Sequence, residues 1–228
     1  MSFHAPDSEL AILNRCAHRG AVAVHPWTWK VLRACADLHR ASDGMFDPAV
    51  AAQLVQLGLL PRPQGSGPDA DVSFAEVQFH KQRRIRFARP LWIDLGGIAK
   101  GFAVDVAVAT LRAHGVRQGT VNAGGDLRVF GPEPAEIWIR CPDQPTQLAR
   151  AGTLRNGACA TSGDYFSARG DSWFIVPPRR RAPIATHSVT VLAKSCMLAD
   201  ALTKIVALDV VGAAPVLARY GAQTSGLH

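Results

Sequence analysis

Apolar residues recur every three or four positions in several parts of this chain, and these stretches predict its helices. The stretch 98–114 ends on His114 and is followed by Gly115, and glycine commonly follows the last turn of a helix. The clearest stretch covers 26–41, where Pro26 comes first and apolar residues follow at helical spacing: Trp27, Val31, Leu32, Cys35 and Leu38. The complete set of predicted helices covers 8–18, 26–41, 49–57, 98–114, 196–208 and 211–220.

Shorter apolar runs bounded by turn residues predict the strands. The runs 72–79 and 84–87 flank a basic turn, while the Pro- and Gly-rich stretch 61–68 is typical of a surface loop. The mixed order of helices and hairpins favours an α+β fold, with a mixed or antiparallel sheet and packed helices, over a doubly wound parallel fold. The remaining strands are expected over 91–94, 119–123, 127–130, 136–140, 152–156, 173–176 and 188–193.

Length and composition describe a globular protein. The chain has 228 residues, of which 48% are hydrophobic and 19% charged, so we expect a single domain over 1–228 with a sizeable core. No apolar run approaches the ~20 residues that a membrane-spanning helix needs. The first ten residues have neither the basic nor the apolar region of a secretory signal. We therefore expect a cytoplasmic protein, or a periplasmic one should the natural start lie further upstream.

The formal net charge of +7 raises the question of a nucleic-acid partner. The basic residues gather only in two short clusters, 81–86 and 179–181, and no ladder of aromatic residues alternates with either. Solvated loops explain these clusters, and we expect no nucleic-acid partner. The five cysteines are scattered without C-x-x-C spacing, which argues against a zinc site and against a disulfide framework.

Glycine-rich turns beside charged residues carry the candidate chemistry. A predicted strand ends on Asp94, Gly96 and Gly97 follow, and a predicted helix then has Lys100 on its first turn. Glycines let a ligand approach the backbone, and free N–H groups at a helix start suit an anion such as a pyrophosphate. The spacing matches neither the Walker nor the Rossmann motif, and a tight turn without a ligand is the alternative interpretation. A second glycine cluster, NAGGD at 122–126, follows the next predicted strand.

Seven blocks of sequence, taken in their order along the chain, resemble the ApbE family of flavin transferases. The blocks are SELAILN at 8–14, GMFDP at 44–48, DLGGIAKG at 94–101, NAGGD at 122–126, ATSGDY at 160–165, SVTV at 188–191 and ADAL at 199–202. The resemblance implies a T-fold-like α+β domain that binds FAD with Mg²⁺ and attaches FMN to a Thr or Ser hydroxyl of an acceptor protein, releasing AMP. In such phosphoryl transfer the protein mainly positions and neutralises the diphosphate and orients the acceptor hydroxyl.

The resemblance also implies which residues hold the cofactor and the metal. The metal ligands would be the carbonyl oxygen of Gly97 and the side chains of Asp200 and Thr203, because hard cations prefer oxygen. The alternative for 44–48 is a plain turn, and for Asp200 it is an acid on a helix surface. The residues implied to contact FAD are Met45, Phe46, Asp47, Asp94, Lys100, Thr161, Ser162 and Phe174.

Three further positions of the resembling blocks, Asn122, Gly124 and Asp126, would shape the floor of the pocket through backbone contacts. Asp105 is interpreted as a structural carboxylate, either on the surface or capping N–H groups. The N-terminal strand and first helix of longer family members have no counterpart in this sequence.

The chain departs from the family pattern at two positions that matter for chemistry. Phe174 stands where the family has the histidine expected to act as general base; losing such a base typically costs roughly 10²–10⁴ in rate. His187, nearby in sequence, is either a substitute base or a surface histidine. Lys204 stands where the family has a threonine ligand to the metal. Since Asp200 and Lys204 share a helix face, Lys204 is expected to pair with Asp200 or to take over the charge role of Mg²⁺.

Three functions follow as alternatives. The first is an FAD:protein FMN transferase, whose partners would be FAD and an acceptor protein. The second is a protein that binds FAD or FMN without turnover, which Phe174 and Lys204 favour. The third is a Mg²⁺-dependent FAD pyrophosphatase, in which water replaces the acceptor hydroxyl. The retained Asp94 and Asp200 favour an enzyme.

Overall fold

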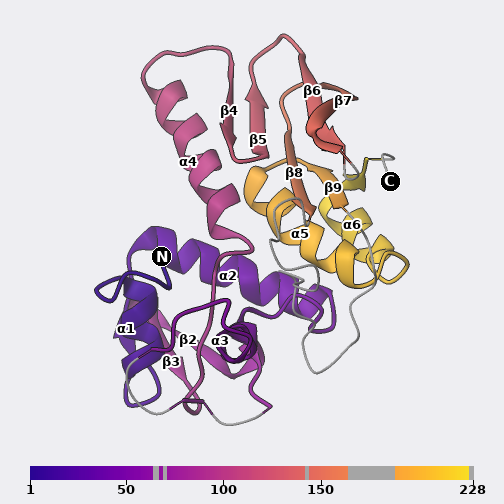
Figure 1. Ribbon diagram of the computed structural model, residues 1–228. Coiled ribbons are helices and arrows are strands. Elements are labelled where there is room, and N and C mark those ends of the chain that lie inside the picture. Colours follow the sequence, from indigo (N-terminus) through magenta and orange to yellow (C-terminus); the bar gives the residue numbers. More distant parts are fainter. Residues whose placement is uncertain (64–66, 69–70, 142–143, 164–187, 226–228) are drawn as a thin grey trace. The chain divides into compact units, whose positions relative to one another are not determined.

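The computed structural model describes residues 1–63, 67–68, 71–141, 144–163 and 188–225 (Figure 1). The described chain divides into two compact units, unit 1 ending at Gly97 and unit 2 beginning at Ile98, and each is presented by itself. Both units combine helices with antiparallel sheets, so the α+β class predicted from the sequence is confirmed. No described helix is both long and apolar enough to cross a lipid bilayer.

Unit 1 joins helices to a small antiparallel sheet with the strand order β1–β3–β2. A side chain caps its first helix, α1 (Glu9–Cys16): the Ser8 hydroxyl accepts a hydrogen bond from the N–H of Ala11 on the first turn. The described helices are α1 (Glu9–Cys16), α2 (Pro26–Ala41) and α3 (Ala51–Gln56), with short 3₁₀ turns at Pro48–Val50, Phe74–Glu76 and Lys81–Arg83. The strands are β1 (Val22–Ala23), β2 (Val77–His80) and β3 (Arg84–Phe87).

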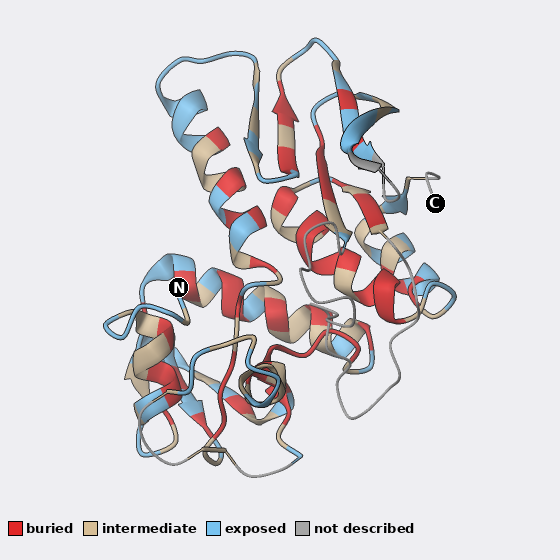
Figure 2. Ribbon diagram, in the orientation of Figure 1, coloured by how far each residue is buried: buried red, intermediate tan, exposed pale blue. Residues whose placement is uncertain are grey.

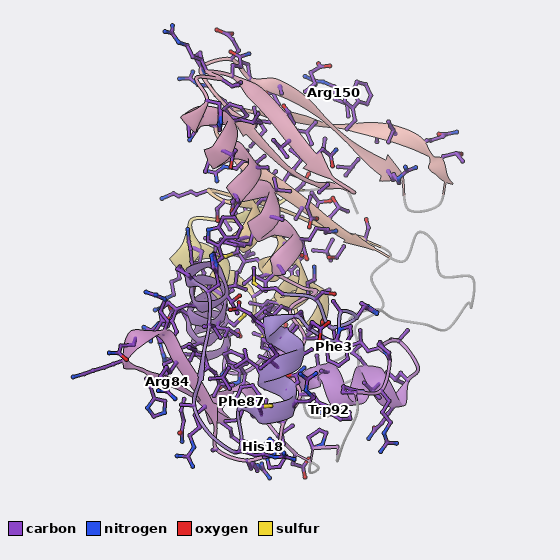
Figure 3. The ribbon with its side chains drawn as sticks, turned by 90° about the vertical axis from the view of Figure 1, so that its left-hand side faces the viewer. Phe3, His18, Arg84, Phe87, Trp92 and Arg150 are labelled. Atoms are coloured by element: carbon purple, nitrogen blue, oxygen red, sulfur yellow. The ribbon has the colours of Figure 1, made fainter. Side chains whose placement is uncertain are left out.

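The segment 91–95 differs from its predicted strand. Its apolar residues are buried, as is Trp92, which Figure 3 labels, but they pair with no described strand. The Asn14 side chain replaces a neighbouring strand, because its amide donates to the Ile93 carbonyl and its oxygen accepts from the Ile93 N–H, both at 3.0 Å. The Asp94 N–H donates to the Pro48 carbonyl at 2.9 Å. The apolar run therefore predicted burial correctly and strand pairing wrongly.

Unit 2 is built on a five-stranded antiparallel sheet with the order β10–β9–β8–β5–β4, beside which β6 and β7 form a separate hairpin. The strands are β4 (Gly119–Ala123), β5 (Asp126–Phe130), β6 (Ala135–Cys141), β7 (Gln144–Leu154), β8 (Ala158–Gly163), β9 (Ser188–Ala193) and β10 (Gln223–Thr224). The described helices are α4 (Ala99–Ala113), α5 (Cys196–Leu208) and α6 (Ala214–Tyr220).

Strand β8 divides its side chains between two apolar clusters. Ala158 and Ala160 are buried with residues of α4 and α5, including Ala199. Cys159, which points to the opposite face, is buried with Ile139 of β6. Helix α5 is buried along most of its length, as Figure 2 shows. The sheet of unit 2 therefore holds α4 and α5 on one face and the β6–β7 hairpin on the other.

Most predicted elements of the described chain are confirmed, and the errors have local causes. The strand expected over 72–79 begins only at Val77, because Ser73 and Glu76 form a capping box around a 3₁₀ turn. Strand β8 was missed, since its small side chains lack the β-branched signal of a strand. The strand expected over 173–176 lies outside the described residues. The bounds agree to the residue for the helices 26–41 and 196–208 and for the strands 84–87, 119–123 and 188–193.

Candidate functional site

Helices α4 and α5 of unit 2 cap each other's first turn. Asp105 on α4 accepts hydrogen bonds from the N–H groups of Cys196 and Met197, which open α5, at 3.0 Å each. Arg128 of β5 pairs with the same carboxylate at 2.5 Å. The first N–H groups of a helix have no partner within the helix, and its positive dipole end attracts an anion. Of the two interpretations of Asp105, the carboxylate that caps N–H groups is confirmed.

Asp200 on α5 makes the reciprocal contact with α4. Its Oδ2 accepts a hydrogen bond at 3.1 Å from the N–H of Gly101, the third residue of α4. Glycine is required at this position, because a Cβ on Gly101 would lie 2.3 Å from the carbonyl oxygen of Cys196 and 2.9 Å from Cβ of Asp200. The AKG motif at 99–101 therefore also encodes the close approach of two helices.

Lys204, one turn after Asp200, has a fully bonded ammonium group. Its Nζ donates to Asp200 Oδ1 at 2.5 Å, to Ser162 Oγ at 3.0 Å and to Thr203 Oγ1 at 3.2 Å. An ammonium has three N–H donors, and each finds an oxygen here. The expectation that Lys204 pairs with Asp200 is thus confirmed.

The NAGGD motif delivers a second buried carboxylate, Asp126. Gly124 and Gly125 have positive φ angles of 64° and 98°, as a tight two-residue hairpin between β4 and β5 demands. Asp126 then opens β5, and its Oδ2 lies 3.2 Å from Nζ of Lys100 on α4. That oxygen accepts no hydrogen bond from the described part of the chain.

These charges form one electrostatic group, which we call the α4-start cluster: Lys100, Asp126, Asp200 and Lys204. Burial and, after it, the charge of Asp200 raise the pKa of Asp126 from 3.8 to about 6, although Lys100 and Lys204 act in the opposite direction. The lysine side chains are 46% and 24% exposed, while those of Asp126 and Asp200 are 2% and 1% exposed. The cluster thus buries its carboxylates and presents its cations, which suits an anionic ligand.

The side chains implied as metal ligands do not leave a cation site open in unit 2. Both oxygens of Asp200 are engaged, one by Lys204 and the other by Gly101. The Thr203 hydroxyl donates to the Asp200 carbonyl at 2.7 Å and lies 2.7 Å from Ser162 Oγ. Among the described residues there is no group of three His, Cys, Asp or Glu that could hold a metal ion. With Lys204 in this position the residues do not fit Mg²⁺.

In unit 1, Asp47 connects three segments. Its Oδ1 accepts from the N–H groups of Ala49 and Phe74 at 2.8 and 3.0 Å, and its Oδ2 accepts from the Ser73 hydroxyl at 2.9 Å. Nε2 of His39 lies 3.2 Å from the same Oδ2. The carboxylate therefore has a structural task, and its contact with FAD stays a prediction.

The other implied ligand residues of unit 1 lie around the same segments. Met45 and Phe46 are buried just before Asp47. Asp94 is half-buried, which raises the pKa of its carboxyl group, and its Oδ2 accepts from the Gly96 N–H at 2.9 Å. Asp94 thus braces the glycine turn that leads to Gly97. Roles of these residues in cofactor or metal binding stay predictions.

The remaining implied residues divide between β8 and the undescribed part of the chain. Ser162 belongs to the oxygen shell of Lys204, while Thr161 Oγ1 lies 2.9 Å from Oγ1 of Thr190 on β9. Phe174 and His187 lie outside the described residues. The sequence interpretation gave Asp126 only a backbone role and missed its carboxylate. The available signal was its position directly after a Gly-Gly turn, at the first residue of a strand.

Two solved ApbE structures have a similar fold. The flavin transferase ApbE from Vibrio cholerae aligns over 96% of this chain, at a TM-score of 0.80 and 30% identity, covering 76% of that chain. The ApbE protein from Thermotoga maritima aligns over 98% of this chain, at a TM-score of 0.81 and 28% identity, covering 79% of that chain.

Curated relatives carry the name FAD:protein FMN transferase. One from Rhodobacter capsulatus is 34% identical over an alignment of 212 positions, which covers 85% of this chain and 40% of the relative. One from Vibrio cholerae is 31% identical over an alignment of 229 positions, which covers 89% of this chain and 66% of the relative. This chain therefore spans between about two fifths and two thirds of the length of these two relatives. The sequence model of the ApbE family matches residues 1–223, and the chain belongs to the ApbE family.

Proposed function

We propose that this chain is an FAD:protein FMN transferase, which binds FAD and transfers FMN to a Thr or Ser hydroxyl of an acceptor protein. Relatives with that name support the proposal, as does a matching solved structure titled a flavin transferase. The observation that carries it is the α4-start cluster, whose two lysines present positive charge beside the first turn of a helix. Cations and a helix start together suit a diphosphate.

The reaction requires the protein to position the acceptor hydroxyl against the diphosphate and to stabilise negative charge. The acceptor oxygen attacks the phosphorus on the FMN side of the diphosphate, and the bond from that phosphorus to the bridging oxygen breaks. AMP leaves with the electron pair of the broken bond, and the hydroxyl proton passes to a base. Negative charge grows on the leaving oxygen, and fixed positive groups stabilise it without reorganising. We assign this electrostatic role to Lys100 and Lys204.

We assign roles toward FAD to the residues of each unit separately. In unit 1 we propose that Met45, Phe46 and Asp94 contact the nucleotide, with Asp47 holding their segments in place. In unit 2 we propose Thr161 and Ser162 on the side of the diphosphate and the acceptor. The proton acceptor is not assigned, because Phe174 occupies the place of the expected histidine.

The proposal is tested by following AMP release from FAD by chromatography. The purified full chain is incubated with FAD and a peptide carrying one acceptor threonine, and a matched peptide carries alanine instead. AMP that depends on the threonine, together with a peptide heavier by FMN, supports the transferase. AMP release without any peptide contradicts it in favour of a pyrophosphatase. Bound FAD without AMP contradicts it in favour of a binding protein.

A further inference from the structure

We propose that the ammonium of Lys204 is the built-in cation of the Asp200 site, and that flavin-nucleotide chemistry there needs no divalent metal ion. The inference rests on the proposed function for its substrate, and on the contacts of unit 2 for its geometry. It assigns to a side chain of this chain the charge role that the family resemblance gives to Mg²⁺.

The first observation behind this inference is the set of oxygen atoms around the Lys204 ammonium. One carboxylate oxygen and two hydroxyl oxygens surround Nζ at 2.5, 3.0 and 3.2 Å. Carboxylate and hydroxyl oxygens are also what a hard divalent ion would take. The Lys204 ammonium already binds Asp200, Ser162 and Thr203, three of the oxygen groups in unit 2 that could serve as metal ligands at this place.

The bonds of Asp200 carry the second step. Its second oxygen accepts from the Gly101 N–H, so a metal ion on this carboxylate would compete with that bond and would lie beside the positive charge of Lys204. An ammonium has no lone pair, so it cannot join a metal's ligand shell and instead repels the ion. The observed Lys204 contact therefore opposes the binding of a divalent ion to Asp200.

Charge balance carries the third step. Within the described residues of the α4-start cluster, two lysines face two buried carboxylates, so no excess negative charge calls for a metal ion. The Lys204 side chain is partly exposed, and a phosphate oxygen can replace one of its hydroxyl partners while Asp200 keeps it in place. A single ammonium then lies where the negative charge of the diphosphate arrives.

The test measures metal binding directly, through the electron paramagnetic resonance signal of free Mn²⁺. The full chain is titrated with Mn²⁺, alongside Lys204→Thr, which restores the residue implied by the resemblance, and Lys204→Thr/Asp200→Asn. Lys194→Thr is the matched control, because it removes the charge of an exposed lysine elsewhere in unit 2.

We expect Lys204→Thr to bind one Mn²⁺ at least tenfold more tightly than the unchanged chain, and the double variant to lose that gain. Lys194→Thr should behave as the unchanged chain does. Equal Mn²⁺ affinity of the unchanged chain and Lys204→Thr would overturn the inference, and so would absence of binding in both. If Lys204→Thr does not fold, Lys204→Arg, which keeps the positive charge, replaces it. Tight Mn²⁺ binding by the unchanged chain or by Lys204→Arg then overturns the inference. Absence of tight Mn²⁺ binding in both proteins supports the inference.

A second readout separates this inference from the proposed function. AMP release from FAD in the presence of the acceptor peptide is compared in EDTA and in Mg²⁺, with equal rates expected for the unchanged chain. Activity that EDTA abolishes overturns the inference and leaves the transferase proposal standing. If no condition gives AMP, the transferase proposal fails, and the Mn²⁺ titration still decides the role of Lys204.

Discussion

The starts of helices α4 and α5 in unit 2 have the same kind of carboxylate contact but differ in the residues around it. At the start of α5, Asp105 binds two backbone N–H groups and pairs with Arg128. At the start of α4, Asp200 binds one backbone N–H group and pairs with Lys204. A carboxylate, a cation and a helix start are common to both, so these three elements alone do not make a site.

The start of α4 differs from the start of α5 in the charged and polar residues around Asp200. A second buried carboxylate, Asp126, shares its electrostatic surroundings, and Lys100 is added at the first turn of the helix. The hydroxyl of Ser162 also joins the shell of Lys204. The difference teaches that the first cap serves packing, while the second carries more charge than packing requires, which is typical of a functional site.

The largest effect is expected from Gly101→Ala, which attacks the packing of α4 against α5. The added Cβ would lie within 2.3 Å of the Cys196 carbonyl oxygen, which is backbone and cannot move without shifting α5. We expect a loss of roughly 3 kcal/mol in the free energy of unfolding. Urea denaturation measures it, with Gly20→Ala as control, because a Cβ at Gly20 meets no atom within 4 Å. A similar stability for both variants would contradict the packing account.

The next effect is expected from Asp105→Ala, which removes the carboxylate that binds the first two N–H groups of α5. The variant leaves the N–H groups of Cys196 and Met197 and the guanidinium of Arg128 without their carboxylate, and we expect a loss of about 2 kcal/mol. Urea denaturation again gives the value. Because the proposed site lies at the start of α4, the affinity for FAD should stay unchanged in the folded variant. A tenfold loss of affinity would contradict the assignment of a purely structural role to the start of α5.

A smaller, pH-dependent effect is expected from Asp126→Asn. Burial raises the pKa of Asp126 from 3.8 in the unfolded chain to about 6 in the folded one. Between these values the folded chain binds more protons than the unfolded chain, so this group's contribution to stability is full below pH 3.8 and is lost as the pH rises through 6. Asparagine removes that dependence, so the variant should gain stability relative to the unchanged chain toward pH 7. Urea midpoints measured in EDTA from pH 4 to 8 check this, and parallel curves for both proteins would refute it.

The smallest effect is expected from Arg150→Ala on the β6–β7 hairpin, where Arg150, labelled in Figure 3, pairs with Glu136. Both side chains are more than half exposed, so water screens the pair. We expect a change in the free energy of unfolding below about 0.5 kcal/mol. A loss as large as that of Asp105→Ala would show that exposure does not separate the hairpin pair from the less exposed pair of Asp105 and Arg128.

Much of the fold was predictable from local patterns. Helix α2 was placed because Pro26 opens it and its apolar residues keep helical spacing. The segment around Ile93 was misjudged, because a distant side chain, Asn14, satisfies its backbone and no local pattern reveals such a partner. Strand β8 escaped prediction because alanine, cysteine and serine give a weak strand signal.

The site was predictable in its residue types and less so in its contacts. The helical spacing of Asp200 and Lys204 correctly predicted their pairing, because residues four apart share a face. The hydroxyls of Ser162 and Thr203 around Lys204 needed the fold, since β8 and α5 lie about forty residues apart in sequence. The meeting of Asp94 with Asp200 at one diphosphate was predicted from the motifs and stays a prediction, as the two belong to different units.

The central claim is that the cations at the start of α4 bind a flavin dinucleotide without a metal ion. The most direct measurement is a titration of the full chain with FAD in EDTA, followed by flavin fluorescence, for the unchanged chain and for Lys204→Met. The account predicts saturable binding by the unchanged chain and at least tenfold weaker binding by the folded variant. Equal affinity of both proteins, or no saturable binding by the unchanged chain, would contradict it.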